Sequence, residues 1–151
     1  GALLGSIAPV PDWARAVLGR RWWLAALVAV APVLLLSAIY ASPLLIPAMD
    51  AHSLHLALQG LALGGGVLSV LTVRASRRPL AVVAAPLLVL AGAGIMLAVT
   101  DLLIAASWFG VTGRDWMRDA LADQHLGGWL VVALALSSAA VAVPLLRSRP
   151  G

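Results

Sequence analysis

Four long apolar runs make up most of this chain, and their lengths limit what it can fold into. They cover residues 22–41, 50–73, 80–106 and 125–146. Because the hydrocarbon core of a bilayer is about 30 Å thick, a helix needs about 20 apolar residues to cross it. The chain is 62% hydrophobic and 11% charged, whereas about 25% of the residues in a soluble domain are charged. We therefore predict an all-α polytopic membrane protein, a four-transmembrane-helix bundle forming one domain over residues 1–151.

The segments between the runs carry the features that end helices or lie at a membrane surface. Two prolines predict a tight connection over residues 42–47. Residues 74–79 form a basic turn, and residues 107–124 are the one extended polar segment. Residues 1–21 mix tryptophan and aliphatic side chains with charges, so we expect this amino-terminal segment to lie flat on the membrane surface. A flexible lead-in is the alternative.

The distribution of arginine predicts the orientation of the spans. Eight of the ten arginines lie within residues 15–21, 74–78 and 147–149, on one side of the four-span layout, and only Arg114 and Arg118 lie on the other. By the positive-inside rule, both termini are expected in the cytoplasm. These arginines separate apolar runs and do not cluster on one polar face, so the sequence does not indicate nucleic-acid binding. The chain also has no cysteine, which excludes disulfides and thiolate metal sites.

Histidines inside a span are candidate functional residues because polar groups in hydrocarbon are costly. On a helix, His52, His55 and Gln59 fall within about 60° of one another, so they form a polar stripe that we expect to face into the bundle, with Gly66 continuing it. His125 opens the fourth span. All three histidines are therefore expected at the same, external, membrane face.

These histidines predict a metal site, since neutral imidazole is the commonest protein metal ligand. His52, His55 and His125 are expected to approach one another and bind copper, with the thioether of Met49 favouring Cu(I). A carboxylate ligand would favour zinc or another harder ion. The candidate carboxylates at the same face are Asp50, Asp101 and Asp123.

Each of these residues also has a structural interpretation. The histidines could instead be hydrogen-bonded at the membrane interface. Asp123 could be the N-cap of the fourth span, and Asp101 could pair with Arg114 or Arg118. The glycine-rich stretches of the second, third and fourth spans predict close helix packing. No G-x-S-x-G pattern occurs, and we expect no enzymatic activity.

One combination of motifs resembles a known family. The sequence Asp123-Gln124-x-x-Gly127-Gly128-Trp129 at the start of a span, with His52-x-x-His55 followed by a glycine-rich stretch, resembles the CtaG-type cytochrome c oxidase assembly factors. The resemblance covers roughly residues 50–146, corresponding to the carboxyl-terminal part of that family. It implies a protein of the bacterial cytoplasmic membrane that assists metallation of the oxidase with copper, and it implies oxidase subunits as partners.

Two other functions stay open from the residues alone. His55 and His125 could ligate haem b in a small redox protein, or the polar stripe could serve only helix contacts in a structural subunit of a larger complex. A second copy of the chain could also complete the metal site. The bilayer itself is the one partner that composition alone requires.

Overall fold

The computed structural model describes residues 9–40, 42, 45–104, 106 and 119–147, and these residues form helices with no strand. The helices are α2 (Asp12–Arg20), α3 (Trp22–Tyr40), α4 (Leu45–Asp50), α5 (His52–Ala75), α6 (Pro79–Val99) and α8 (Ala120–Arg147). Four of them, α3, α5, α6 and α8, are long and apolar enough to cross a membrane. The predicted all-α, four-span architecture is confirmed.

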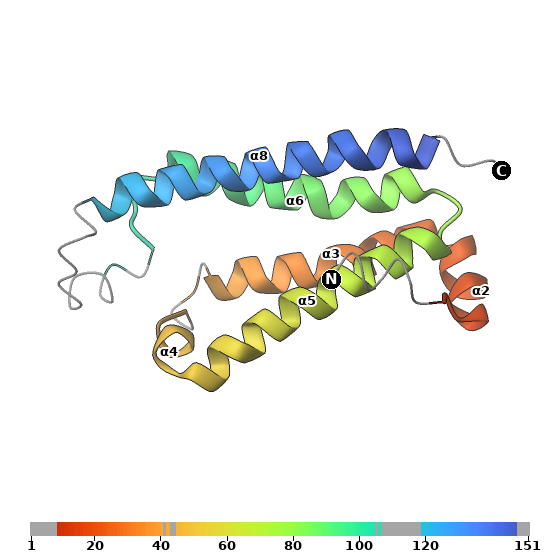
Figure 1. Cartoon of the computed structure of the whole chain (residues 1–151), viewed down its shortest axis with the longest axis horizontal. Coiled ribbons are helices and arrows are strands. Elements are labelled where there is room, and N and C mark those ends of the chain that lie inside the picture. The colour runs from red at the N-terminus through yellow and green to blue at the C-terminus, as the bar shows by residue number, and fades with distance from the viewer. Residues whose placement is uncertain (1–8, 41, 43–44, 105, 107–118, 148–151) are drawn as a thin grey trace.

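The four long helices associate as two pairs (Figure 1). Helix α6 packs along α8, helix α3 packs on α5, and contacts between α3 and α6 join the pairs. Helices α5 and α8 make at most marginal contact with each other. Both begin at the same end of the molecule, here called the histidine end because His52, His55 and His125 lie near these helix starts. The opposite end, with Arg20, Arg77 and Arg78, is called the arginine end.

The buried core lies toward the arginine end. Its members are small: Ala25 and Ala29 of α3 meet Val73 of α5 and Val82 of α6. A second cluster beside it places Val10 and the α2 residue Ala14 against Ala75. Within the amino-terminal segment, residues 12–20 form α2, a helix docked on the ends of α3 and α5.

Close contacts between helix backbones determine how each pair fits together. A Cβ atom on Gly128 of α8 would lie 2.5 Å from the Ala98 nitrogen and 2.6 Å from the Gly94 carbonyl oxygen of α6. On α5, a Cβ at Gly65 would lie 2.5 Å from the Cβ of Pro32 in α3. Small residues at such positions let two helices approach in a medium that offers no hydrophobic driving force. The expected close packing is confirmed at Gly65, Gly94 and Gly128.

Neighbouring glycines do not share this role. A Cβ at Gly60, Gly64, Gly92 or Gly127 would meet nothing within 4 Å. The close packing predicted for the glycine-rich stretches is therefore not met at these four positions within the single chain. One position along a helix is a rotation of about 100°, so Gly64 points away from α3 while Gly65 contacts it.

Several predicted helix boundaries also differ. Helix α6 ends at Val99 and not near residue 106, and α8 begins at Ala120, ahead of the expected residue 125. The α8 boundary follows from Asp119, whose carboxylate Oδ1 accepts a hydrogen bond from the Ala122 N–H at 2.9 Å. This is the bond of an N-cap residue to the third residue of its helix. Asp119, and not Asp123, therefore caps α8.

The connection before the second span is helical in part. Residues 45–50 form α4, with Pro47 in its first turn, where a missing backbone N–H costs nothing. Ala51 is extended and separates α4 from α5. Asp50 consequently ends α4 and does not open the second span.

The glycine contacts predict a stability difference between adjacent positions. We expect Gly128→Ala to destabilise the protein by about 1–3 kcal/mol, because the added methyl group meets backbone atoms that cannot move independently. Gly127→Ala is the matched control and should be neutral or slightly stabilising, since alanine favours helix over glycine. Thermal unfolding in detergent measures both, and equal melting temperatures for the two variants would contradict the packing.

Candidate functional site

The polar stripe of α5 lies at the histidine end and is held by a bond within the helix. The Gln59 amide nitrogen donates to Nε2 of His55 at 3.0 Å. Since an amide nitrogen only donates, Nε2 accepts, and the proton of the neutral ring is on Nδ1. His55 is half-buried, whereas His52 and Gln59 are exposed.

This stripe does not face the neighbouring helix. The face of α5 that contacts α3 carries Gly65, which fits against Pro32, and Ser69, whose hydroxyl donates to the Ala29 carbonyl at 3.1 Å. These two contacts determine the rotation of α5, and that rotation leaves His52 and Gln59 on the uncovered side. The expectation that this stripe points into the bundle is therefore wrong for His52 and Gln59 within one chain, while His55 is half-buried.

The start of α8 makes a second polar cluster, built on the backbone that follows α6. The Gln124 side chain accepts from the Ile104 N–H at 2.8 Å through Oε1 and donates to the Leu102 carbonyl at 3.1 Å through Nε2. The adjacent His125 donates from Nε2 to the Thr100 carbonyl at 2.9 Å. Two neighbouring side chains thus satisfy three backbone groups of the non-helical segment 100–104.

The hydrogen bond to the Thr100 carbonyl determines which ring nitrogen of His125 carries the proton. A carbonyl oxygen only accepts, so Nε2 carries the proton and Nδ1 of the neutral ring has a free lone pair. Metal-ligating histidines commonly donate their second ring nitrogen to a carbonyl in this way, which orients the ring. His125 therefore has the bonding pattern of a ligand, although the bond also has a purely structural use.

The geometry does not assemble the predicted ligands within one chain. Among the described residues, no group of three histidine or acidic side chains is arranged to hold a metal ion. His52 and His55 belong to the α3–α5 pair and His125 to the α6–α8 pair, and α5 and α8 make at most marginal contact. The expectation that the three histidines approach one another is therefore not met in the single chain.

The remaining candidates lie around these clusters. Asp50, Asp101 and Asp123 are exposed at the histidine end, and Asp123 is in the first turn of α8, where a negative charge is favourable to the helix dipole. The Met49 side chain, and the proposed pairing of Asp101 with Arg114 or Arg118, lie outside the described residues.

Sequence reasoning missed the contacts that order the segment after α6. It treated residues up to 106 as one span and did not connect Gln124 with Leu102 and Ile104. The signal was present in the polar pair Gln124 and His125, four and three positions before Gly128. Positions three and four apart share a helix face, so both side chains point to the same neighbour as Gly128.

Removal of the Gln124 side chain tests whether it orders the segment after α6. In Gln124→Ala, the Ile104 N–H and the Leu102 carbonyl lose their partners, and we expect a loss of about 1–3 kcal/mol of stability with faster amide exchange at Ile104. Gln59→Ala is the control, because the Gln59 amide bonds only the side chain of His55. Unchanged exchange at Ile104 would argue against the contact.

Comparison with known proteins places this chain in a family. No curated protein and no solved structure gives a significant match to the chain. A family model, described as cytochrome c oxidase caa3 assembly factor (Caa3_CtaG), matches residues 2–148. The match extends beyond the region of resemblance at residues 50–146 to the amino-terminal helices. The chain belongs to the family of cytochrome c oxidase caa3 assembly factors.

Proposed function

We propose that this protein is a copper-binding, non-enzymatic assembly factor of the bacterial cytoplasmic membrane that assists metallation of cytochrome c oxidase. The observation that carries the proposal is the family match over residues 2–148, together with the gathering of every histidine of the chain at one end of the bundle. Copper is the cargo in this proposal, so the site must bind the ion and also release it.

The α5 pair is the accessible part of the site. His52 and His55 are separated by three positions on one helix, and the uncovered face of α5 leaves His52 exposed. Two imidazoles at this spacing can bind one ion, since side chains three apart lie side by side. Met49 and Asp50, at the end of α4, are the candidates for further ligands nearest to this pair in sequence, and Asp123 is the candidate nearest to His125.

His125 needs a neighbouring molecule if it is to bind the same ion as His52 and His55. Its free Nδ1 is suited to coordination, but its helix pair is not the one that carries His52 and His55. A neighbouring molecule could bring the two sets of ligands together, and we infer that this molecule is an oxidase subunit or a second copy of the chain. An incomplete ligand set on each molecule would favour transfer over permanent binding.

Orientation follows from the arginine end. One end of the bundle carries the arginines Arg20, Arg77, Arg78 and Arg147, which lie at or just beyond helix ends. An excess of arginine is typical of the cytoplasmic side of a membrane protein. The histidine end is then external, where the copper centre of an oxidase subunit outside the membrane could be loaded.

Copper titration of the purified protein tests the proposal. We expect His52→Ala/His55→Ala to weaken Cu(I) binding at least about tenfold, measured in detergent against a chromogenic chelator.

The control for this titration is Gln59→Ala. That change removes the amide that occupies Nε2 of His55, so copper affinity should stay the same or rise. An unchanged copper stoichiometry in the double histidine variant would refute the copper site. A haem absorption band in the purified protein would instead support the redox alternative.

Reporter fusions test the orientation. A reporter fused behind Ser76 should remain cytoplasmic, and one fused behind Ile104 should reach the external side, because the arginine-rich turn lies between α5 and α6. The opposite pattern of reporter activity would overturn the orientation without affecting the copper test.

A further inference from the structure

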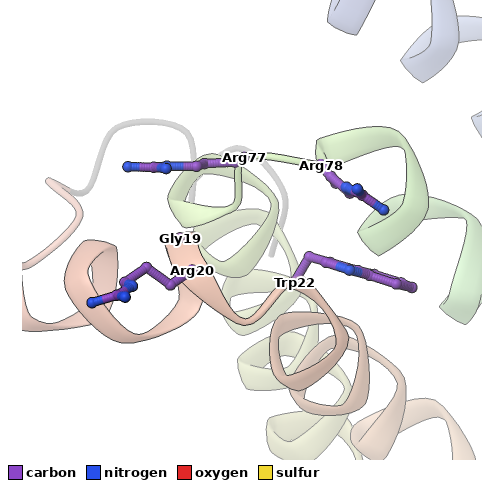
Figure 2. A pocket seen from close by; sticks show the side chains of 5 residues that line it. All are labelled: Gly19, Arg20, Trp22, Arg77 and Arg78. Carbon is purple, nitrogen blue, oxygen red and sulfur yellow. The ribbon is translucent and has the colours of Figure 1, made fainter.

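Three of the five residues that line a pocket at the arginine end are arginines. Figure 2 shows Arg20 and Arg77 on one side of Gly19, and Arg78 beside Trp22 on the other. These five residues line a space of about 400 Å³, which is within the range of about 300–1,000 Å³ typical of small-molecule sites. The arginines come from two separate parts of the chain, at the end of α2 and in the turn before α6.

The fold brings these two parts together by a close contact. Gly19 is buried, and a Cβ at this position would lie 3.3 Å from the Ala75 carbonyl oxygen. The end of α2 therefore rests on the end of α5, which places Arg20 near the following turn. In that turn, the Arg78 N–H donates to the Ser76 hydroxyl at 3.1 Å, and α6 starts at Pro79.

The pocket has positive charge without a compensating carboxylate. Among the described residues, its lining contains three guanidinium groups and no acidic side chain. The ion pair recorded in the described part of the chain joins Arg15 to Asp12, both outside the pocket. The Arg78 guanidinium lies 5.5 Å from the centre of the Trp22 ring, a cation–π contact that positions it but does not neutralise it. The Arg20 and Arg77 side chains both extend to one side of Gly19 (Figure 2), so an anion on that side would meet two uncompensated guanidinium groups.

The surroundings of the pocket indicate where the anion comes from. Trp22 is the first residue of a membrane-spanning helix, and the other lining residues lie at or beyond helix ends, so the pocket is at the level of the lipid headgroups. Trp13 of α2 is 71% exposed and Trp23 is 50% exposed. Exposed tryptophans beside span ends are typical of the membrane interface. A headgroup phosphate would lie at the same depth as the guanidinium groups.

We propose that Arg20 and Arg77 bind the phosphate of an anionic phospholipid headgroup, while Arg78 stays against the Trp22 ring beside them. Arginine suits this ligand because its planar fork makes paired hydrogen bonds to phosphate oxygens. Bound lipid would tie α2 to the turn between α5 and α6. This site is independent of copper binding at the opposite end of the bundle.

Lipid competition tests the site in the full-length protein. After delipidation in a neutral detergent, native mass spectrometry measures retention of phosphatidylglycerol against phosphatidylcholine with the same acyl chains. We expect wild-type protein to prefer phosphatidylglycerol in a saturable, one-lipid manner. Arg20→Gln/Arg77→Gln should lower that preference about tenfold or more, from the loss of two interfacial cations.

The matched control removes the same net charge outside the pocket. Arg15→Gln/Arg147→Gln changes one residue already paired with Asp12 and one at the end of α8, and should keep the preference. An equal loss in both double variants would overturn the site, because net charge alone would then explain it. Displacement of the lipid by inorganic phosphate would overturn the lipid assignment.

A measurement on wild-type protein does not depend on the variants folding. Added salt should reduce the preference for phosphatidylglycerol, since Arg20 and Arg77 are exposed and their charges are open to screening. Uptake of phosphatidylglycerol that never saturates, or that ignores salt, would contradict a defined site.

Discussion

The contact of helix backbones across small residues is the interaction on which the rest of this molecule depends. In a bilayer, the apolar side chains of a span are solvated equally well by lipid and by another helix. Helix association must therefore come from close packing and hydrogen bonds. Gly128 against Gly94 and Ala98 joins α8 to α6, and Gly65 against Pro32 joins α5 to α3. Each contact determines both the separation of its helices and their rotation.

The rotation of α8 explains the polar cluster at its start. With Gly128 against α6, the residues one turn earlier point in the same direction, and Gln124 and His125 meet the backbone that continues from α6. That backbone leaves its helix at Val99, and the two side chains bond the Ile104 N–H and the Thr100 and Leu102 carbonyls. In a protein that spans a membrane this matters, because unpaired backbone groups near hydrocarbon cost several kcal/mol each. The hydrogen bond from His125 to the Thr100 carbonyl also holds the ring in the tautomer whose Nδ1 can accept a metal ion.

The two ends of the bundle have different chemical characters. At the arginine end, small buried residues from α3, α5 and α6 form the core, and α2 closes onto them. At the histidine end, the polar side chains of α5 are exposed and the two helix pairs contribute separate sets of possible ligands. One end of the bundle is therefore packed and the other is open and polar.

The sequence by itself determined the number of spans, their order and the end of the bundle that carries each histidine, because run length and apolarity are enough to specify helices in hydrocarbon. It also contained the motifs by which the family is recognised. The tertiary structure alone decided which glycines make contact, since Gly64 and Gly65 are equivalent in sequence but point in different directions. It decided where α6 ends, because the partners of residues 100–104 are on α8. It also brought Arg20 to Arg77 and Arg78, since only the packing of α2 on α5 joins parts of the chain that lie so far apart in sequence.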